Sequence, residues 1–391
     1  MIGIVGCSDP ESLRTSIMSA PHVAFVGIGN PLLDISTEVD VSYPAKFNLN
    51  PNEAYLASPE TEPLFKELES MPNLSLVPGG ASQNTTRVVQ WILHEKESAA
   101  YFGCIANDHF GNKQKEIMEK QNVKVCYDVT DEKPTGTCAA LNNAEGRCLV
   151  ANIASAGCFK ATHLLKPDNL AIADSAKVAY TEGFFTDVSM ESLLIIAHRR
   201  LKDQDKYFSM NLSAQWVIQG HTEKILELFP YADFVFCNED EARCFAEVMG
   251  WAEKVDLVKI AAQMSLFPKH NPAKQRIVCI THGPEPITLA TAFGKDEDKK
   301  LPYGHGCIKF TADCGSACTD RATVKTYPVP VIPKEEFKDA NGCGDSFVGG
   351  FIASFIKGLP LEKCVENGNF IAGIITRSEG CTFPTVCPLK L

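Results

Sequence analysis

The sequence lacks the long apolar stretch that a membrane protein needs. No uninterrupted apolar run in the 391 residues approaches the ~18 residues that cross a bilayer. The first residues have only a short apolar start followed by Asp9, Glu11 and Arg14, so they do not resemble the apolar core of a secretory signal. We therefore expect no membrane contact, a location in the cytoplasm with the nucleus as the alternative, and an N-terminal extension without function over residues 1–21.

Positive charge is also in short supply. The chain has 37 Lys and Arg against 48 Asp and Glu, which gives a formal net charge of −11. Because proteins hold nucleic acid through clustered Lys and Arg, this balance argues against a general nucleic-acid binder. It does not exclude a nucleotide substrate, since a single phosphate group needs only a few local donors.

Cysteine is abundant, but the spacing of a disulfide framework or a zinc site is missing. The sixteen cysteines are scattered along the chain, and no Cys-x-x-Cys pair occurs. Zinc at Cys307, Cys314 and Cys318 is therefore not favoured. This distribution is typical of reduced thiols in an intracellular protein.

Strands and helices are predicted to alternate along most of the chain. Short runs rich in Val, Ile and Phe predict buried strands at residues 22–28, 99–105, 178–180, 207–212, 234–237 and 276–281. Segments with helical spacing lie between or after them, at residues 83–94, 111–121, 189–201, 222–229, 240–249 and from 347 onward. The alternation predicts an α/β fold with a doubly wound, mostly parallel sheet flanked by helices.

Two segments interrupt this alternation, at residues 36–78 and 133–156. The second contains two short apolar runs, 135–141 and 147–153, around a polar turn, which predicts a β-hairpin. We predict that the two segments form one small β lid over the large part of a single domain spanning 22–391. Residues 295–333 carry many charges, glycines and prolines, and we expect an irregular insertion there, either an extended surface hairpin or a partly mobile segment.

A late glycine-rich segment, Asp339-Ala-Asn-Gly-Cys-Gly-Asp345, precedes an apolar helix. The first N–H groups of a helix are unpaired, so those of Gly342, Cys343 and Gly344 are expected to bind an anion. Asp345 could take a proton from a hydroxyl group that attacks a phosphoryl group. A simple helix cap after a glycine turn is the alternative. Because a helix start lowers the pKa of a nearby thiol, we also expect Cys343 to be reactive.

An early segment, Pro78-Gly-Gly-Ala-Ser-Gln-Asn84, has complementary features. Gly79 and Gly80 would let a sugar approach the backbone closely. The side chain of Asn84 offers both a donor and an acceptor to a hydroxyl group. The early segment is therefore expected to bind a substrate that carries hydroxyl groups.

Together, the early and late segments resemble the two signatures of the ribokinase-like carbohydrate and purine kinases, over about residues 25–384. The resemblance implies an α/β domain with a β lid, ATP as co-substrate and Mg²⁺ as cofactor. Gly29-Asn-Pro-Leu-Leu-Asp-Ile35 is similar to the start of family members that phosphorylate adenosine. It implies that Asp34 and Asn30 bind the ribose.

The resemblance also implies an apolar pocket for a purine base, and a purine has a π-face that suits such walls. The implied pocket residues are Leu32, Leu56, Cys138, Leu149, Ala151, Phe185 and Trp216. Each of them alone is more simply explained as a core residue, and only the joint match indicates a pocket. Arg147 matches a lid arginine that reaches toward the transferred phosphate, and a solvated arginine of the hairpin is the alternative.

Further residues are implied on the ATP side. Asn238 and Glu241 match an Asn-x-x-Glu motif that positions Mg²⁺ through water, although this spacing is also that of a helix cap. The implied ATP contacts are Thr281, Gly283, Asn341 and Asn367. The expected reaction is phosphorylation of the 5′-hydroxyl of adenosine, giving AMP and ADP, by a monomer. Another nucleoside or sugar kinase, or an inactive nucleoside-binding protein, remains the alternative.

Overall fold

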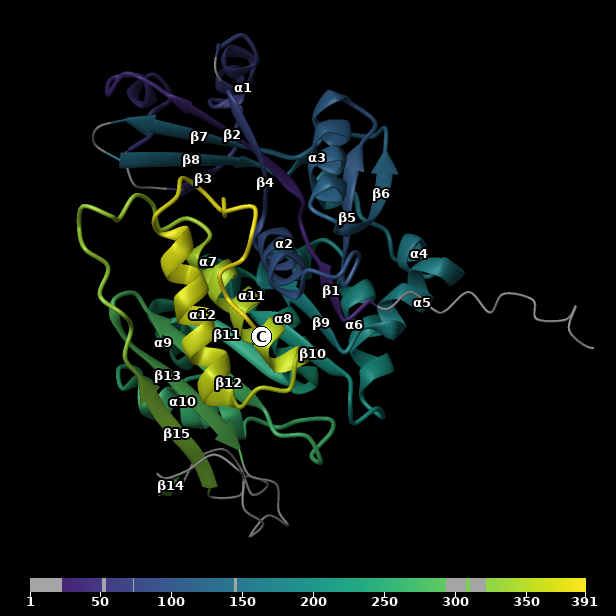
Figure 1. Ribbon diagram of the computed structural model, residues 1–391, viewed down its shortest axis with the longest axis vertical. Helices are drawn as coiled ribbons and strands as arrows, with labels where there is room; N and C mark the ends of the chain where they lie inside the picture. The colour runs from purple at the N-terminus through teal and green to yellow at the C-terminus, as the bar shows by residue number, and fades with distance from the viewer. Residues whose placement is uncertain (1–22, 51–53, 73, 144–145, 293–306, 310–320) are drawn as a thin grey trace, which may run out of the picture.

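The computed structural model describes residues 23–50, 54–72, 74–143, 146–292, 307–309 and 321–391. The predicted N-terminal extension and much of the 295–333 segment lie outside these residues. The chain forms two sheets, one of ten strands and one of five. In Figure 1 the large sheet runs from β6 at the right to β14 at the bottom, and the small sheet lies at the top.

The large sheet has the strand order β14-β15-β13-β12-β11-β10-β9-β1-β5-β6. The strands from β6 to β12 in this order are parallel, and β13, β15 and β14 extend the sheet antiparallel at one edge. The strands are β1 (Phe25–Ile28), β5 (Ala99–Ala106), β6 (Lys124–Thr130), β9 (Val178–Glu182), β10 (Tyr207–Asn211), β11 (Phe234–Asn238), β12 (Ile277–His282), β13 (Glu285–Ala292), β14 (Cys307–Lys309) and β15 (Arg321–Tyr327).

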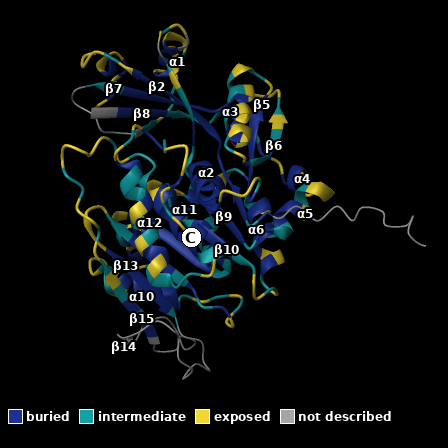
Figure 2. Cartoon of the chain, viewed as in Figure 1, coloured by how far each residue is buried: buried dark blue, intermediate teal, exposed yellow. Residues whose placement is uncertain are grey.

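Helices cover both faces of this sheet, so most residues of its central strands are buried. Alternate residues of β11 show the two faces: Phe234 and Phe236 belong to one core cluster, while Val235 and Cys237 belong to the other. The first face is covered by α2 (Ala81–Leu93), α11 (Cys343–Ile356) and α12 (Leu361–Ile375), and the second by α6 (Met190–Arg200), α8 (Thr222–Leu228), α9 (Glu239–Val248) and α10 (Leu257–Leu266). In Figure 2 these layers enclose the buried centre.

The small sheet has the order β3-β8-β7-β2-β4. Its strands are β2 (Leu32–Glu38), β3 (Ala54–Leu56), β4 (Ser75–Gly79), β7 (Thr137–Asn143) and β8 (Gly146–Asn152). Helix α1 (Glu62–Glu69) packs on it through Leu64 and Leu68. The sheet therefore combines the two segments that interrupt the strand–helix alternation, and its first strand begins before residue 36, the predicted lid boundary.

The remaining helices connect these layers. They are α3 (His109–Lys120), α4 (Ala161–Leu164), α5 (Pro167–Ser175) and α7 (Gln215–Gly220), with 3₁₀ turns η2 (Pro44–Phe47), η3 (Ala154–Cys158), η4 (Gly183–Asp187) and η5 (Phe229–Tyr231). Within the described ranges, no helix combines the length and the apolar character that a membrane span requires.

Residues 321–327 belong to the predicted insertion, yet they have a regular structure. They form β15, which pairs with β13 along its whole length. Ala322 and Val324 face the core, while Thr323 and Lys325 alternate with them. This two-residue period is the mark of a strand with one buried face, but the surrounding charges and prolines hid it in the sequence.

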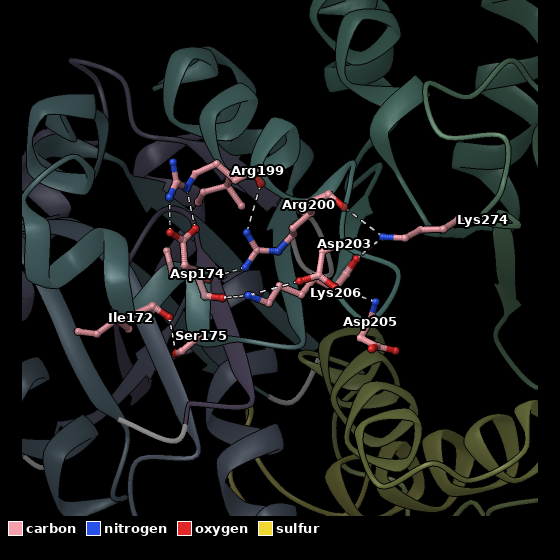
Figure 3. A network of polar contacts seen from close by, with 11 residues as sticks. Ile172, Asp174, Ser175, Arg199, Arg200, Asp203, Asp205, Lys206 and Lys274 are labelled. Atoms are coloured by element: carbon pink, nitrogen blue, oxygen red, sulfur yellow. Dashed lines mark hydrogen bonds and ion pairs between the residues drawn. The ribbon is translucent and has the colours of Figure 1, made fainter. Parts of the chain in front are cut away.

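Long cationic side chains satisfy carbonyl groups where α5 and α6 end (Figure 3). Arg200 Nη2 donates to the Ala173 carbonyl at 2.6 Å, and Lys274 Nζ donates to the Arg200 carbonyl at 3.1 Å. Arg199 Nε also donates to Asp174 Oδ1 at 2.6 Å. Because the last carbonyls of a helix have no partner within it, these contacts stabilise both helix ends.

Candidate active site

A cavity of about 420 Å³ opens where the central parallel strands end. Asn211, Asn238 and Thr281 line it from the carboxyl ends of β10, β11 and β12, and the start of α11 closes it on another side. Ligands of open α/β sheets bind at this edge. The cavity brings together many of the predicted site residues: Asn238, Glu241, Thr281, Asn341, Gly342, Gly344 and Asp345.

The start of α11 has the backbone shape that the glycine-rich segment predicts. Gly342 precedes the helix with a φ of 77°, and a Cβ there would lie 2.8 Å from the Cys381 Cβ. At Gly344 an added Cβ would meet no atom within 4 Å. Glycine is therefore required at the first position, and the second faces open space that a ligand can enter. The Cys343 N–H donates to the Ala340 carbonyl at 3.2 Å, within a turn.

Asp345 is a partly buried carboxyl in the first turn of α11, at the wall of the cavity. Loss of solvent around it raises its pKa to about 7, and the charges of Glu182, Asp34 and Glu241 act in the same direction. A hydrogen bond from Asn84 opposes them. A carboxyl with a pKa near neutrality is suited to accept a proton during a reaction and release it afterwards.

The thiol of Cys343 is not activated, contrary to prediction. Burial raises its pKa to about 12, and nearby Asp339 adds to the effect. Its Sγ lies 3.8 Å from the Asp339 carbonyl. The expected effect of the helix start is therefore outweighed by desolvation.

The Asn84 side chain forms two hydrogen bonds within the protein. Its Nδ2 donates to Asp345 Oδ2 at 3.0 Å, and its Oδ1 accepts from Arg87 Nη1 at 3.2 Å. Asn84 therefore contacts the candidate base, and its contact with a sugar stays a prediction. Arg87 escaped the sequence analysis because a single arginine in a helical pattern predicts a solvent-exposed side chain.

Gly79 and Gly80 leave space for the Asp34 carboxylate and for the backbone carbonyl of Asn30, respectively. Asp34 lies in β2, and a Cβ at Gly79 in β4 would be 2.2 Å from its Oδ1. Gly80 has a φ of 90°, and a Cβ there would be 2.2 Å from the Asn30 carbonyl oxygen. Substitution at either glycine would displace the residues predicted to bind ribose.

Asn30 offers an acceptor that no described residue uses. Its Oδ1 is buried without a hydrogen-bond partner among the described residues. Its backbone N–H donates to Glu182 Oε1 at 2.8 Å. Since buried polar atoms in proteins are nearly always hydrogen-bonded, the Asn30 Oδ1 is an expected ligand contact.

Glu182 is a structural anchor of the site that the sequence analysis missed. Its second oxygen accepts from the Ser82 N–H at 2.6 Å, so the carboxylate ties the chain after β1 to the start of α2. Burial raises its pKa. A glutamate that ends an apolar strand, here β9, was the available signal.

The apolar residues predicted to hold a base divide into two groups. Leu32 and Cys138 form a cluster with Leu149 and Ala151 on the small sheet. Leu56, also on that sheet, is 54% exposed. These residues lie together on one element, as a common pocket wall requires.

The second group belongs to the large domain, and here one prediction is wrong. Phe185 is completely buried in the core, with its ring 5.6 Å from that of Phe159. Phe184 lines the cavity instead, and its ring lies 5.5 Å from that of Trp216. Both phenylalanines are in η4, where adjacent side chains point in different directions, so the sequence alone did not distinguish them.

Asn238 and Glu241 start α9 and line the cavity at the same time. Asn238 Oδ1 accepts from the Glu241 N–H at 2.8 Å, and Glu241 Oε2 accepts from the Asn238 N–H at 3.1 Å. Burial raises the pKa of Glu241 to about 7. The helix-cap and ligand-binding interpretations are therefore compatible.

The donor set around Glu241 suits magnesium bound through water. In the described part of the chain, no group of three or more His, Cys, Asp or Glu residues could hold a metal ion. Mg²⁺ keeps several waters and needs only one or two carboxylates beside substrate phosphates. The single carboxylate of Glu241 at the cavity wall fits that pattern.

The other predicted ATP contacts differ in position. Thr281 lines the cavity, and Gly283 follows β12 with a φ of 52°. Asn367 does not reach the cavity lining: its Nδ2 donates to Ser354 Oγ at 2.9 Å, between α12 and α11. Its predicted ATP contact is not supported, because the amide joins two helices. Arg147 lies in β8, opposite Asn142 in β7.

Comparisons with known proteins agree with this geometry. The model of the pfkB family of carbohydrate kinases matches residues 50–386. Adenosine kinase 2 of Arabidopsis thaliana is 36% identical over 359 residues, covering 92% of this chain and 95% of the relative. Adenosine kinase of Dictyostelium discoideum is 35% identical, covering 94% and 98%. Anopheles gambiae adenosine kinase, solved in complex with P1,P4-di(adenosine-5) tetraphosphate, has a TM-score of 0.77 and 34% identity, covering 91% of this chain and 96% of that one.

Proposed function

The chain belongs to the pfkB family of carbohydrate kinases, and from this premise we propose that it transfers the γ-phosphoryl group of ATP to the 5′-hydroxyl of adenosine. The products are AMP and ADP. The observation that carries the proposal is Asp345, a cavity-lining carboxyl with a pKa of about 7 in the first turn of a helix whose start faces the cavity. The similarity to adenosine kinases along nearly the whole chain supports adenosine as the acceptor.

In the proposed reaction, Asp345 removes the proton of the 5′-hydroxyl as its oxygen attacks the γ-phosphorus. The bond between that phosphorus and the ADP oxygen breaks, and the proton stays on the carboxyl until it returns to solvent. Backbone N–H groups at the start of α11, including that of Gly344, stabilise charge on the transferred group. Such transfer depends chiefly on positioning and on charge stabilisation.

The ribose is held by acceptors on the small-sheet side. The Asp34 carboxylate can accept from two neighbouring hydroxyl groups, and the Asn30 Oδ1 supplies a further buried acceptor. The base would lie against the Leu32–Cys138 cluster and the Phe184–Trp216 pair. Apolar and aromatic walls suit a purine ring better than a free sugar.

ATP would occupy the cavity between Thr281 and the start of α11, with Mg²⁺ on its phosphates. Asn238 and Glu241 would hold the hydrated ion. When bound, Mg²⁺ neutralises phosphate charge and so makes the γ-phosphorus easier to attack.

The small sheet is proposed to close over adenosine. Leu56 and Trp216 are half exposed although both belong to the proposed base pocket. Closure would bury both side chains and bring Arg147 of β8 toward the phosphates. It would also exclude water, which otherwise competes with the hydroxyl group for the phosphoryl group.

A panel of nucleosides and sugars, scored for ATP-dependent release of ADP, tests the proposed function. Adenosine should give the highest kcat/KM. Faster turnover of ribose or fructose than of any nucleoside would establish a sugar kinase instead. Adenosine binding without ADP release would establish an inactive nucleoside-binding protein.

A further inference from the structure

Arg87 is a buried cation placed one turn after Asn84 in α2. Its Nη1 donates to three oxygen atoms: Asn84 Oδ1 at 3.2 Å, the Pro78 carbonyl at 2.7 Å and the Cys381 carbonyl at 3.1 Å. Its Nε donates to Gln121 Oε1 at 2.8 Å. A buried guanidinium group is stable only when such partners replace its lost water.

These contacts fix Arg87 from opposite sides of the site. Pro78 precedes Gly79, the residue over which the Asp34 carboxylate lies. Cys381 lies against Gly342 at the start of α11. The Arg87 guanidinium also lies 5.2 Å from the ring centre of Phe383. The cation is therefore held by the small-sheet strand β4 and by the C-terminal segment.

The side-chain amide of Asn84 can be oriented in two ways, and Arg87 selects one. An amide has a donating and an accepting end, whereas a guanidinium group can only donate. With Arg87 on one side, the Asn84 oxygen must face the guanidinium, so its NH₂ group faces Asp345 Oδ2 at 3.0 Å. Without Arg87, the amide could turn and accept a hydrogen bond from a protonated Asp345.

We propose that Arg87 is a positioning residue for phosphoryl transfer, which holds the Asn84 amide so that it donates to the carboxylate of Asp345. This inference rests on the proposed function, in which Asp345 acts as the base. Arg87 touches neither substrate nor reacting atoms. It acts through Asn84, and it stabilises the form of Asp345 that can accept a proton.

Other ionisable groups also surround Asp345, and they influence its pKa independently of Arg87. Carboxylates on β2, β9 and α9 raise its pKa: Asp34, Glu182 and Glu241. Tyr180 of β9 and the thiols of Cys343 and Cys381 also interact with it. Because acidic neighbours predominate, the hydrogen bond from Asn84 is a main influence that favours the ionised base.

The pH dependence of kcat/KM tests this role. The acid limb is the part of the pH profile over which kcat/KM falls as the pH is lowered. In Arg87→Met this limb should move to higher pH by about 1 unit, which corresponds to a roughly tenfold loss of activity at pH values below the limb. The KM for ATP should change little. Arg87→Lys, whose ammonium group can donate three hydrogen bonds, should restore the limb toward its original position. Gln121→Ala, which removes only the partner of Nε, should leave the limb in place.

A double-mutant cycle separates the relay through Asn84 from a direct effect of the Arg87 charge. If Arg87 acts through Asn84, adding Arg87→Met to Asn84→Ala should not move the limb further. An equal shift in both backgrounds would overturn the proposal, as would an unmoved limb in folded Arg87→Met. If Arg87→Met does not fold, Arg87→Gln takes its place, with the same expected shift. Wild-type protein without adenosine-dependent ADP release would instead remove the proposed function.

Discussion

At the scale of single residues, the site is organised around carboxyl groups held away from water. Asp345 and Glu241 both have pKa values raised to about 7, mainly by burial. The raised pKa makes Asp345 a base that works near neutral pH, whereas an exposed aspartate would be a much weaker base. Loss of solvent, together with the neighbouring carboxylates, therefore changes the chemistry that the side chain can perform.

We predict that kcat/KM falls as the pH is lowered through about 7, because Asp345 must be ionised to accept a proton. Its folded-state pKa is above the ordinary value for aspartate, so activity is present above about pH 7 and lost below it. A pH–rate profile with adenosine measures the limb. Glu241→Gln is the control: if the limb remains in this variant, the titrating group is not Glu241, and if it disappears, Asp345 does not set it.

The residue types of the site were predictable, but some of their contacts were not. The Asp345 and Asp34 positions could be named because their motifs are distinctive. Phe184 and Phe185 are chemically identical neighbours. Successive side chains of the 3₁₀ turn η4 point in different directions, so Phe184 lines the cavity and Phe185 lies in the core. The partner of Asn84 depends on Arg87 and Asp345, and Asp345 lies 261 positions away in sequence.

At the scale of elements, buried ionic contacts fasten the amino ends of the central strands. Asp233, just before β11, accepts from the Phe208 N–H of β10 at 2.8 Å and pairs with Lys269. Their side chains are only 5% and 9% exposed. Arg276, before β12, is buried and donates to the Phe229 and Ala232 carbonyls. Asp233 therefore balances the charge of two buried cations.

Asp233→Ala should lower the free energy of unfolding by about 3–5 kcal/mol, because it leaves Lys269 and Arg276 buried without their counterion. Urea unfolding measures the change. Asp187→Ala is a matched control, since it removes an exposed pair with Lys224 at 2.7 Å and should cost at most about 1 kcal/mol. Similar losses in both variants would contradict the importance of the buried contact.

Which elements could be predicted from sequence depended on how they are buried. All eight residues of β5 are buried, so its sequence is a continuous apolar run that predicts a strand. β15 has one buried face and is surrounded by charged and proline-rich sequence, so its alternation was not recognised. The small sheet pairs segments that are about a hundred residues apart in the sequence. The local residue pattern indicates strands in each segment but does not determine which strands pair.

At the scale of the whole molecule, the small sheet and the large domain each supply part of the proposed site. The Asp34 side of the ribose site is on β2, while the proposed base is on α11. A substrate that contacts both must therefore link the two parts. Closure of the small sheet over the substrate is the motion that we propose from this division of residues.

Adenosine should shift the emission of Trp216 to shorter wavelength, because closure would remove water from a side chain that is now 49% exposed. Fluorescence titration measures this change. Trp216→Phe keeps an aromatic ring and should lose most of the signal, since Trp91 is buried in the core and Trp251 packs on Phe245, outside the cavity lining. An unchanged spectrum at saturating adenosine, with binding confirmed by calorimetry, would argue against closure over this residue.

The most direct test of the proposed reaction compares Asp345→Asn with Asp34→Ala. Calorimetry with adenosine and a coupled ADP assay measure binding and turnover separately. Asp345→Asn, nearly isosteric, should bind adenosine almost as wild type does and lose about 10²-fold or more in turnover. Asp34→Ala should weaken adenosine binding by about 1.5–3 kcal/mol, the cost of a hydrogen bond to a charged group. Near-normal turnover of folded Asp345→Asn would contradict its assignment as the base.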